Sequence, residues 1–394
     1  MKKYAAFTAL LLTVLTLLCA CGGQEPAQED APPPEDREEQ ALYRWDTMWD
    51  GPGAEPLALA YAQSFSVDLS EYGYARITID GDVYLLVPEK APLPQGTPED
   101  VVILQQPIGN IYLQATSSMD CFRRLDALDA IALSGTQADG WYIPEAREAM
   151  ETGKILYAGK YSAPDYELIK SSDCGLALMS TMVYHNPEVK EQLERFGIPV
   201  LVERSSYETH PLGRMEWIKL YGVLLDRLEE AEAFFDRQLT QLAPILEQEN
   251  TGRTVAFFAI NSNGSVTVRK SGDYIAKAID LAGGVYAFHD LTEEENALST
   301  MNIQMEIFYD TARDADILIY NSAIDANLTT IEELLDKSAS LGNFKAVQNG
   351  DVWCTGKSMF QESLGVGDMI LDLHAICSQE DPADQDLRYL HRLA

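Results

Sequence analysis

The densest group of residues that could do chemistry occupies positions 205–217, where serine, tyrosine, glutamate, histidine and arginine stand close together. Hydroxyl, imidazole and carboxylate groups could form the triad of a hydrolase, but the chain has no G-x-S-x-G elbow to expose a nucleophile. The same residue types can hold a ligand, with Tyr207, His210 and Arg214 facing a cleft. A structural alternative stays open, in which His210 and Glu208 only cap and fix a hinge.

Metal chemistry has little support in the sequence. The chain has five histidines and no H-E-x-x-H pair. No cysteines stand in C-x-x-C spacing, so a zinc or redox site is not expected. We therefore expect no catalytic residues, no metal site and no intrinsic cofactor. We expect four cysteines to be small buried residues, although an export context permits a disulfide: Cys121, Cys174, Cys354 and Cys377.

Aromatic and basic residues also follow several predicted strands. The chain holds 29 Lys and Arg against 62 Asp and Glu, so their grouping predicts an anionic or oxygen-rich ligand with a flat apolar surface. The further candidate ligand-binding residues are Trp141, Tyr142, Lys160, Tyr184, His185, Arg269 and Lys357. For His185, which precedes Asn186-Pro187, the alternative is a residue that caps a helix.

The elements that must position these residues alternate between strands and helices from residue 101 onward. Apolar runs predict strands at 101–104, 130–133, 155–158, 176–179 and 199–202, and again at 254–260, 285–288, 317–320 and 352–354. This alternation predicts an α/β fold with two parallel-sheet lobes joined by one long α-helix, after an N-terminal β-rich segment. Ligands of parallel sheets bind outside the carboxyl ends of the strands.

Between the two lobes, apolar residues recur at helical spacing over residues 215–246 without an internal stop signal. We predict a single helix there, within an interlobe segment of residues 211–250. The first lobe then spans residues 41–210 and the second spans residues 251–394. The leading β segment has predicted strands at 57–65, 74–79 and 83–88, with Asp80-Gly81 as a hairpin turn. Residues 110–128 have a helix-like pattern.

The first 21 residues predict export. Lys2 and Lys3 precede an apolar run that is too short to span a bilayer, and a small residue precedes Cys21. This pattern is typical of a lipoprotein signal, with Cys21 as the lipidated N-terminus. Residues 22–40 are acidic and proline-rich and predict a disordered linker. The expected location is the outer face of the cell membrane, held by the lipid anchor alone; an ordinary signal peptide is the alternative.

The net charge of −33 excludes two kinds of partner. Nucleic-acid binding requires clustered Lys and Arg, and adhesion to anionic lipid requires a basic surface. We expect a soluble monomer beyond the anchor.

Several segments, taken in order, resemble the substrate-binding proteins of ABC importers for iron complexes and cobalamin. They are LERFGIPV at 193–200, Asp273-Tyr274-Ile275 running to LAGG at 281–284, ADILI at 315–319 and FKAVQNGDVW at 344–353. The resemblance covers roughly residues 101–377. It departs from the family where the usual Ser-Pro after the first strand is replaced by Gln105-Gln106-Pro107.

The resemblance implies a protein that captures a small-molecule metal chelate outside the cell and delivers it to an ABC permease and its ATPase. We favour a ferric siderophore, because the basic residues suit anionic oxygen ligands. Haem and cobalamin are alternatives, and haem would require an axial Tyr or His such as Tyr184, His185 or His210. A surface hydrolase or a sensory or adhesive binding module are the competing classes.

A weak sequence similarity between the two predicted lobes places a glutamate at the same position in each. Glu167 and Glu306 each lie in a short predicted helix ahead of an Asp that leads into a buried strand. Similarity to the family implies that a glutamate on each lobe docks on arginines of the permease. The alternative is that each is an acidic residue in the first turn of a helix, where it favours the helix dipole.

Overall fold

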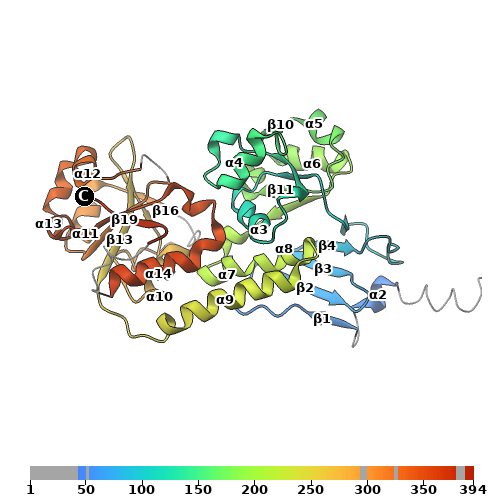
Figure 1. The fold of residues 1–394 in the computed structure, drawn as a ribbon, viewed down its shortest axis with the longest axis horizontal. Coiled ribbons are helices and arrows are strands. Elements are labelled where there is room, and N and C mark those ends of the chain that lie inside the picture. Colours follow the sequence, from blue (N-terminus) through green and yellow to red (C-terminus); the bar gives the residue numbers. More distant parts are fainter. Residues whose placement is uncertain (1–42, 50–52, 293–299, 324–326, 379–386) are drawn as a thin grey trace, which may run out of the picture.

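A computed structural model describes residues 43–49, 53–292, 300–323, 327–378 and 387–394. The predictions for residues 1–40, including Cys21, lie outside this part of the chain. The described residues form an N-terminal sheet, two α/β lobes and a helical connector between the lobes (Figure 1). The predicted fold class, two α/β lobes joined through a long helix after a β-rich segment, is confirmed.

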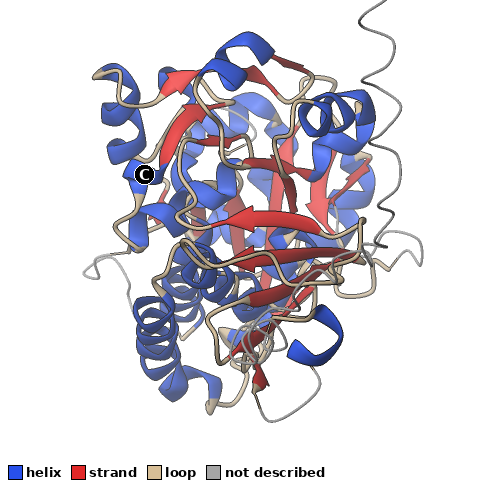
Figure 2. Ribbon diagram, turned by 90° about the vertical axis from the view of Figure 1, so that its right-hand side faces the viewer, coloured by secondary structure: helices blue, strands red, loops and turns tan. Residues whose placement is uncertain are grey.

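The N-terminal sheet lies beside the first lobe and away from the second (Figures 1 and 2). Its strands follow one another in chain order, antiparallel except for the last pair. The predicted Asp80-Gly81 turn is confirmed, and both residues have the positive φ that such a turn requires. The elements are α2 (Trp45–Met48), β1 (Ala54–Pro56), β2 (Phe65–Ser70), β3 (Ala75–Ile79), β4 (Asp82–Val87) and β5 (Val102–Gln105).

Two predictions for this segment are wrong. Residues 57–64 form a loop rather than a strand, because the backbone N–H groups of residues 60–64 bind the Glu216 and Glu208 carboxylates instead of a neighbouring strand. The strand predicted at 101–104 belongs to this sheet as β5 and does not open the first lobe.

The first lobe has a parallel sheet in the order β12-β11-β6-β7-β8. The helix-like pattern over 110–128 is only partly helical. Its first residues form the fully buried central strand β6, and the helix begins at Met119. The elements are β6 (Ile111–Leu113), α3 (Met119–Arg124), β7 (Ile131–Ser134), α4 (Pro144–Glu151), β8 (Leu156–Tyr157), β9 (Gly159–Lys160), β10 (Ala163–Pro164), α5 (Tyr166–Ser171), β11 (Ala177–Ser180), α6 (Pro187–Arg195) and β12 (Val200–Glu203).

The second lobe has a mixed sheet whose centre, β13-β17-β18, is parallel and buried. Antiparallel strands flank this centre on both sides. The elements are β13 (Thr254–Ile260), β14 (Val266–Arg269), α10 (Tyr274–Leu281), β15 (Val285–Tyr286), β16 (Thr300–Ile303), α11 (Met305–Ala312), β17 (Ile317–Tyr320), α12 (Ile331–Lys337), α13 (Lys345–Asn349), β18 (Val352–Thr355), α14 (Val366–Cys377) and β19 (Leu390–Arg392).

The connector is not the single helix predicted over 215–246. It consists of α7 (Pro211–Glu216), α8 (Ile218–Leu224) and α9 (Leu228–Leu246), and α8 and α9 pack against each other as a hairpin. Asp226 adopts a left-handed conformation at the bend, and the Arg227 N–H binds the Gly222 carbonyl at 2.7 Å. A Cβ on Gly222 would lie 2.7 Å from the Ala231 Cβ, so glycine permits this close packing. The long helix that runs toward the second lobe is α9 alone, about 28 Å long at 1.5 Å per residue.

Two buried glutamates fasten the N-terminal segment to the connector. The Glu216 carboxylate accepts the backbone N–H groups of Ala60, Tyr61 and Ala62 at 2.8–3.0 Å and the Lys219 ammonium at 2.8 Å. Both oxygens of the carboxylate are therefore satisfied in a fully buried position.

Glu208 does the same for the next two residues of the loop. Its carboxylate accepts the N–H groups of Gln63 and Ser64 at 2.9–3.1 Å and the indole N–H of Trp217 at 2.9 Å. The N–H groups of residues 60–64 are thus all bound by two carboxylates, one on α7 and one in the turn before it.

All four cysteines of the described residues are buried, as predicted, and all four are free, which decides the disulfide question that the sequence left open. Burial raises the pKa of each thiol, most strongly for Cys121 and Cys377. These side chains are therefore unreactive core residues.

We predict that Glu216→Gln destabilises the protein by about 3 kcal/mol at pH 7, because it leaves the buried Lys219 ammonium without its counter-ion. Urea denaturation of residues 43–394 measures this. Glu230→Gln, on the exposed side of α9, is the matched control and should change the free energy of unfolding by less than about 0.5 kcal/mol.

The stability difference between wild type and Glu216→Gln should depend on pH. Burial alone would raise the pKa of the Glu216 carboxyl, but the Lys219 ammonium and the three backbone N–H groups outweigh it and lower the pKa. A lowered pKa adds stability above the unfolded-state value of about 4.3, and this stability is lost as the pH falls through the folded-state pKa. The stability difference between wild type and Glu216→Gln should therefore shrink below about pH 4. A difference that stays constant down to pH 3 would contradict the assignment.

Candidate functional site

The strand order of the first lobe locates its binding edge. From β6 the chain continues to β7 and β8 on one side, and then to β11 and β12 on the other. Ligands of open parallel sheets bind outside the carboxyl ends of the strands where the order reverses, here between β6 and β11. The second lobe meets the first along this edge.

Residues 357–365 of the second lobe, which we call the strap, cross to the first lobe. The Gln361 side chain accepts a hydrogen bond from the Tyr142 N–H and donates one to the Gly140 carbonyl, each at 2.7 Å. Gly140 and Tyr142 follow β7, so the strap covers the cleft at that strand. The strap contains two 3-10 turns, η7 (Lys357–Phe360) and η8 (Ser363–Gly365).

The other end of the strap rests on the segment after β6. The Ser363 hydroxyl donates to the Ser117 carbonyl at 2.7 Å, and the Leu364 N–H donates to the fully buried Asp120 carboxylate at 3.0 Å. Arg123 pairs with the same carboxylate. Burial raises the pKa of Asp120, although the arginine opposes this. The β6 and β7 half of the cleft is therefore closed by direct contacts between the lobes.

Arg214 lies at the base of the cleft, on α7. Its guanidinium carbon lies 3.9 Å from the centroid of the Tyr274 ring on α10 of the second lobe. No Asp or Glu oxygen of the described residues lies within 4.0 Å of this guanidinium. Glu203 is near enough to feel its charge, but burial raises the pKa of that carboxyl and opposes its ionisation. The positive charge of Arg214 is thus incompletely neutralised.

A second arginine approaches the same place from the second lobe. Arg269 pairs with Asp273 at 3.3 Å and lies over the Phe360 ring at 5.1 Å. Both Arg269 and Arg214 are close enough to oppose the rise that burial causes in the pKa of Tyr274. Arg214, Tyr274 and Phe360 line one small cavity, together with Met359, Glu362, Ser363 and Met369.

One predicted site residue is wrong. Trp141 is 0% exposed, and its indole N–H donates to the Ser134 hydroxyl at 3.2 Å. Its ring fills the core of the first lobe and cannot meet a ligand. Its neighbour Tyr142 is exposed and has the Lys357 ammonium 5.8 Å from its ring centroid.

His210 has a clear structural role. Its Nδ1 accepts the Leu212 N–H at 3.2 Å and caps α7, and its ring stacks on Tyr61 at 4.8 Å. Burial, followed by the nearby Lys277, lowers the pKa of His210, which keeps Nδ1 available as an acceptor. With Glu208 bound to the loop of residues 57–64, the capping alternative of the sequence analysis describes both residues.

The remaining predicted residues are exposed at the carboxyl ends of three strands. Tyr207 follows β12, Tyr184 and His185 follow β11, and Lys160 lies in β9 just beyond β8. The structure thus brings Arg214, Arg269, Lys357 and Tyr142 together around the strap, with Tyr184 and Tyr207 toward the β11 and β12 end. Lys160 lies beyond β8, at the opposite edge of the sheet.

Sequence reasoning missed Tyr274 and the strap residues Gln361 and Ser363. Tyr274 follows the helix-capping Asp273, whose side chain accepts the Ile275 N–H, so its place at a helix start could have been found. Nothing in the local sequence marks Gln361, whose partners stand 219 and 221 positions away.

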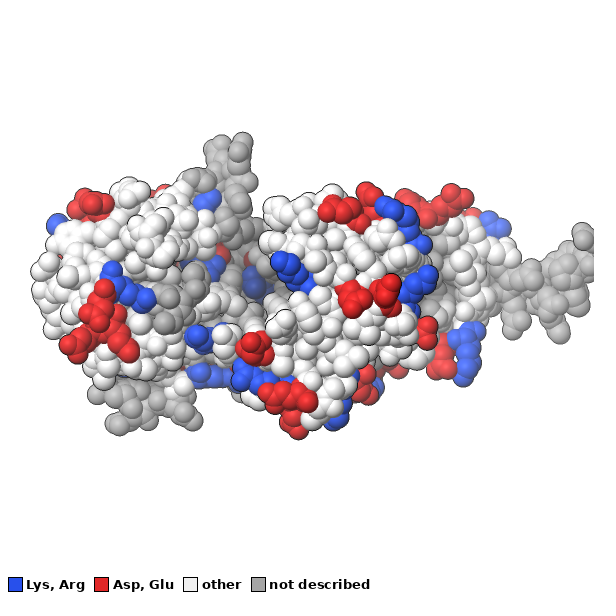
Figure 3. Space-filling view, turned by 90° about the horizontal axis from the view of Figure 1, so that it is seen from above, with Lys and Arg blue, Asp and Glu red and all other residues white. Residues whose placement is uncertain are grey.

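The charge distribution of the surface separates the cleft from the outer faces. Figure 3 shows Lys and Arg side chains in the hollow between the lobes, whereas the outer surfaces carry side chains of both signs. A positively charged hollow concentrates anions, although the whole chain has a net charge of −33. In the described ranges, no group of three or more His, Cys, Asp or Glu side chains is placed to hold a metal ion.

No family model matches the chain. Relatives in Methanocaldococcus jannaschii include two uncharacterised lipoproteins. One is 26% identical over 243 residues, 61% of this chain and 56% of its own length. The other is 22% identical over 259 residues, 64% of each chain. The match to the first relative thus spans just over half of that protein.

Solved structures match the fold over almost their whole length. The petrobactin-binding protein YclQ of Bacillus subtilis has a TM-score of 0.57 at 14% identity, with 77% of this chain and 99% of that chain covered. A periplasmic haem-binding protein of Pseudomonas aeruginosa has a TM-score of 0.55 at 16% identity, with 72% of this chain and 97% of that chain covered. An ABC transporter substrate-binding protein of Listeria monocytogenes has a TM-score of 0.50 at 16% identity, with 68% of this chain and 98% of that chain covered.

The chain has the fold of ABC transporter substrate-binding proteins of the siderophore and haem class. The three neighbours are named as binding proteins, and none is named as an enzyme. Among the helices of the described residues, none combines the length and hydrophobicity needed to span a bilayer.

We predict that Gln361→Ala loosens the contact between the lobes. Removing two neutral hydrogen bonds of about 1 kcal/mol each should speed hydrogen exchange of the Tyr142 amide about tenfold or more. Hydrogen exchange followed by mass spectrometry or NMR measures this. Gln241→Ala, on the exposed side of α9, serves as the control. An unchanged Tyr142 amide would show that the strap does not hold the lobes together.

Proposed function

We propose that this protein captures an anionic iron chelate outside the cell and delivers it to an ABC permease and its ATPase. The observation that carries the proposal is Arg214, an incompletely neutralised guanidinium at the base of the cleft in a fold that solute-binding proteins share. An arginine held in this way favours an anionic oxygen ligand, because its planar donors match carboxylate and phenolate oxygens.

A ferric siderophore suits the cleft better than haem or cobalamin. Of the candidate axial ligands for haem, His210 caps α7 through Nδ1 and stacks on Tyr61, so its ring is already engaged on two sides. Tyr184 and His185 are exposed and follow β11, whereas the strap contacts lie after β6 and β7. The petrobactin-binding neighbour supports the siderophore class, and the haem-binding neighbour keeps haem as the alternative ligand.

The location and partners follow from the same proposal. The relatives named as lipoproteins support lipidation at Cys21 and attachment to the outer face of the cell membrane. The chelate is a ligand carried for transport and not a cofactor of a reaction. The proposed protein acts as a monomer beside its permease.

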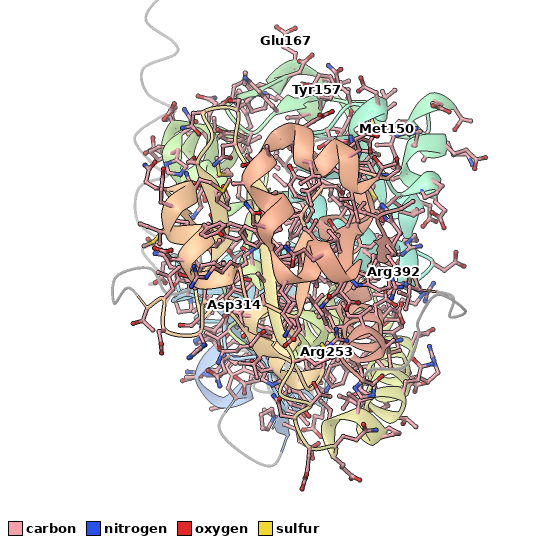
Figure 4. All side chains as sticks on the ribbon, turned by 90° about the vertical axis from the view of Figure 1, so that its left-hand side faces the viewer. Met150, Tyr157, Glu167, Arg253, Asp314 and Arg392 are labelled. Carbon is pink, nitrogen blue, oxygen red and sulfur yellow. The ribbon has the colours of Figure 1, made fainter. Side chains whose placement is uncertain are left out.

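The exposure of Glu167 and Glu306 supports a role as permease contacts. Both are exposed in the first turn of their helices, α5 and α11. In Figure 4 the Glu167 side chain projects outward from the surface of the first lobe. Asp165 already caps α5 by accepting the Leu168 N–H at 3.0 Å, so Glu167 is not needed for that role. We propose that these two carboxylates pair with arginines of the permease.

We predict that Arg214→Ala weakens binding of a ferric tris-catecholate or tris-hydroxamate about tenfold or more, about 1.4 kcal/mol. Quenching of intrinsic tryptophan fluorescence measures the dissociation constant. Arg313→Ala, at an exposed arginine of the second lobe, is the charge-matched control and should bind normally. Equal affinities for Arg214→Ala and wild type would remove Arg214 from the site.

We also predict that Glu167→Ala combined with Glu306→Ala sharply reduces ATP-driven uptake in vesicles that hold the permease and ATPase. Chelate affinity should stay unchanged, because both residues lie outside the cleft. The matched control replaces two other exposed first-turn glutamates, Glu188 and Glu332, by alanine. Normal transport by the Glu167 and Glu306 variant would refute the docking role.

A further inference from the structure

The cavity that Arg214 lines is far smaller than a chelate. Its volume is about 10 Å³, which is room for about one water molecule. Sites for small-molecule ligands have volumes of about 300–1,000 Å³. The strap forms one wall of this cavity through Met359, Phe360 and Ser363. In the arrangement that the structure describes, the strap therefore keeps a chelate out of the space beside the Arg214 guanidinium.

The strap is fastened to its own lobe by one carboxylate. Glu362 accepts the Tyr389 hydroxyl at 2.6 Å and pairs with Arg388 at 3.3 Å. Both partners directly precede β19. Asp372 of α14 accepts the backbone N–H groups of residues 388–390 at 2.6–3.2 Å. The strap thus rests on a segment that α14 holds in place.

Tyr389 contacts the strap at both ends. Its carbonyl accepts the N–H of Gly356, just before the strap begins, at 2.9 Å. At the other end, a Cβ on Gly365 would overlap the Tyr389 hydroxyl, so glycine permits this packing. Between the two ends, the Arg269 guanidinium of the second lobe lies over the Phe360 ring. The strap is therefore a fixed part of the second lobe.

The hydrogen bonds that join the strap to the first lobe are mostly of a weaker kind. Gln361 and Ser363 make three of them, to Tyr142, Gly140 and Ser117, and all three join neutral groups. Water replaces such bonds when they break, so each one contributes little net free energy. The strap therefore separates more easily from the first lobe than from the second.

The charged contacts of the strap can also part without leaving a charge unpaired. The buried Asp120 carboxylate accepts the Leu364 N–H, but it also pairs with Arg123 of its own lobe. Arg123 lies 3.9 Å from Glu362, a longer distance than the 3.3 Å to Arg388. After separation, Asp120 keeps Arg123, and Glu362 keeps its partners in the second lobe.

We propose that the strap is a gate, which must part from the first lobe before a chelate can occupy the space beside Arg214. This inference rests on the proposed function and adds a step to it. The strap stays on the second lobe through Glu362 and Tyr389, so the gate opens at its contacts with the segments after β6 and β7. Only the opened fraction of the protein binds, so the gate lowers the apparent affinity.

The test weakens the gate by combining Gln361→Ala with Ser363→Ala, which removes the three neutral hydrogen bonds. Titration and stopped-flow measurements of tryptophan fluorescence use a ferric tris-catecholate and a ferric tris-hydroxamate as probes. We expect the association rate constant to rise about tenfold and the dissociation constant to fall about tenfold, because a larger fraction of molecules is open. The matched control combines Gln348→Ala, on the exposed side of α13, with Ser358→Ala in the strap, and should bind as wild type does.

A second measurement needs no chelate. Met359→Cys places a thiol in the wall of the cavity, at a side chain that is only 7% exposed. A maleimide should label this thiol about tenfold faster when Gln361→Ala and Ser363→Ala are also present, because labelling requires the gate to open. Mass spectrometry of the peptide that contains residue 359 measures the rate. The control pair of substitutions should leave the rate unchanged.

The outcomes separate the gate from the proposed function. An unchanged or weaker affinity of the Gln361 and Ser363 variant overturns the gate, and the proposed function stands if Arg214→Ala still weakens binding. A wild-type protein that binds neither chelate overturns the proposed function. The labelling rate then decides the gate by itself, and a rate that the two substitutions leave unchanged overturns it.

Discussion

The architecture depends on two buried carboxylates that accept backbone N–H groups of a loop far away in the sequence. Glu208 and Glu216 together accept the N–H groups of residues 60–64, a loop that has no strand partner for these donors. An unpaired buried N–H would cost about 1–3 kcal/mol, and an unpaired buried carboxylate more. The loop N–H groups and the two carboxylates therefore satisfy each other. These hydrogen bonds join the N-terminal segment to residues about 150 positions later in the chain.

Helix α7, which carries Glu216, also carries the positively charged Arg214 at the base of the cleft. Arg214 stands two residues before Glu216 on α7, a short helix whose other side chains are almost all buried. The same helix packs on α10, which supplies Tyr274 under the guanidinium. Arg214 is thus held in place by its surroundings, which in the proposed function would reduce the conformational entropy lost on binding.

The positive residues of the cleft stand in a chain of strongly negative net charge. Lys and Arg side chains in the hollow between the lobes give it a local positive potential, although the whole chain carries a net charge of −33. The strap divides this hollow. Its contacts occupy the β6 and β7 half, and the N-terminal sheet borders the β11 and β12 half.

The sequence by itself determined the alternation of strands and helices, the Asp80-Gly81 turn and the burial of the cysteines, because apolar spacing and turn residues act locally. It did not separate one long helix from the α8–α9 hairpin, since both bury one apolar stripe and only Gly222 and Asp226 make the bend. Nor did it separate Trp141 in the core from Tyr142 beside it in the cleft. Periodicity records that a side chain is buried, but tertiary structure decides what covers it. Gln361 and Glu216 found their partners only when segments more than 150 positions apart were folded together, because backbone N–H and carbonyl groups carry no sequence signature.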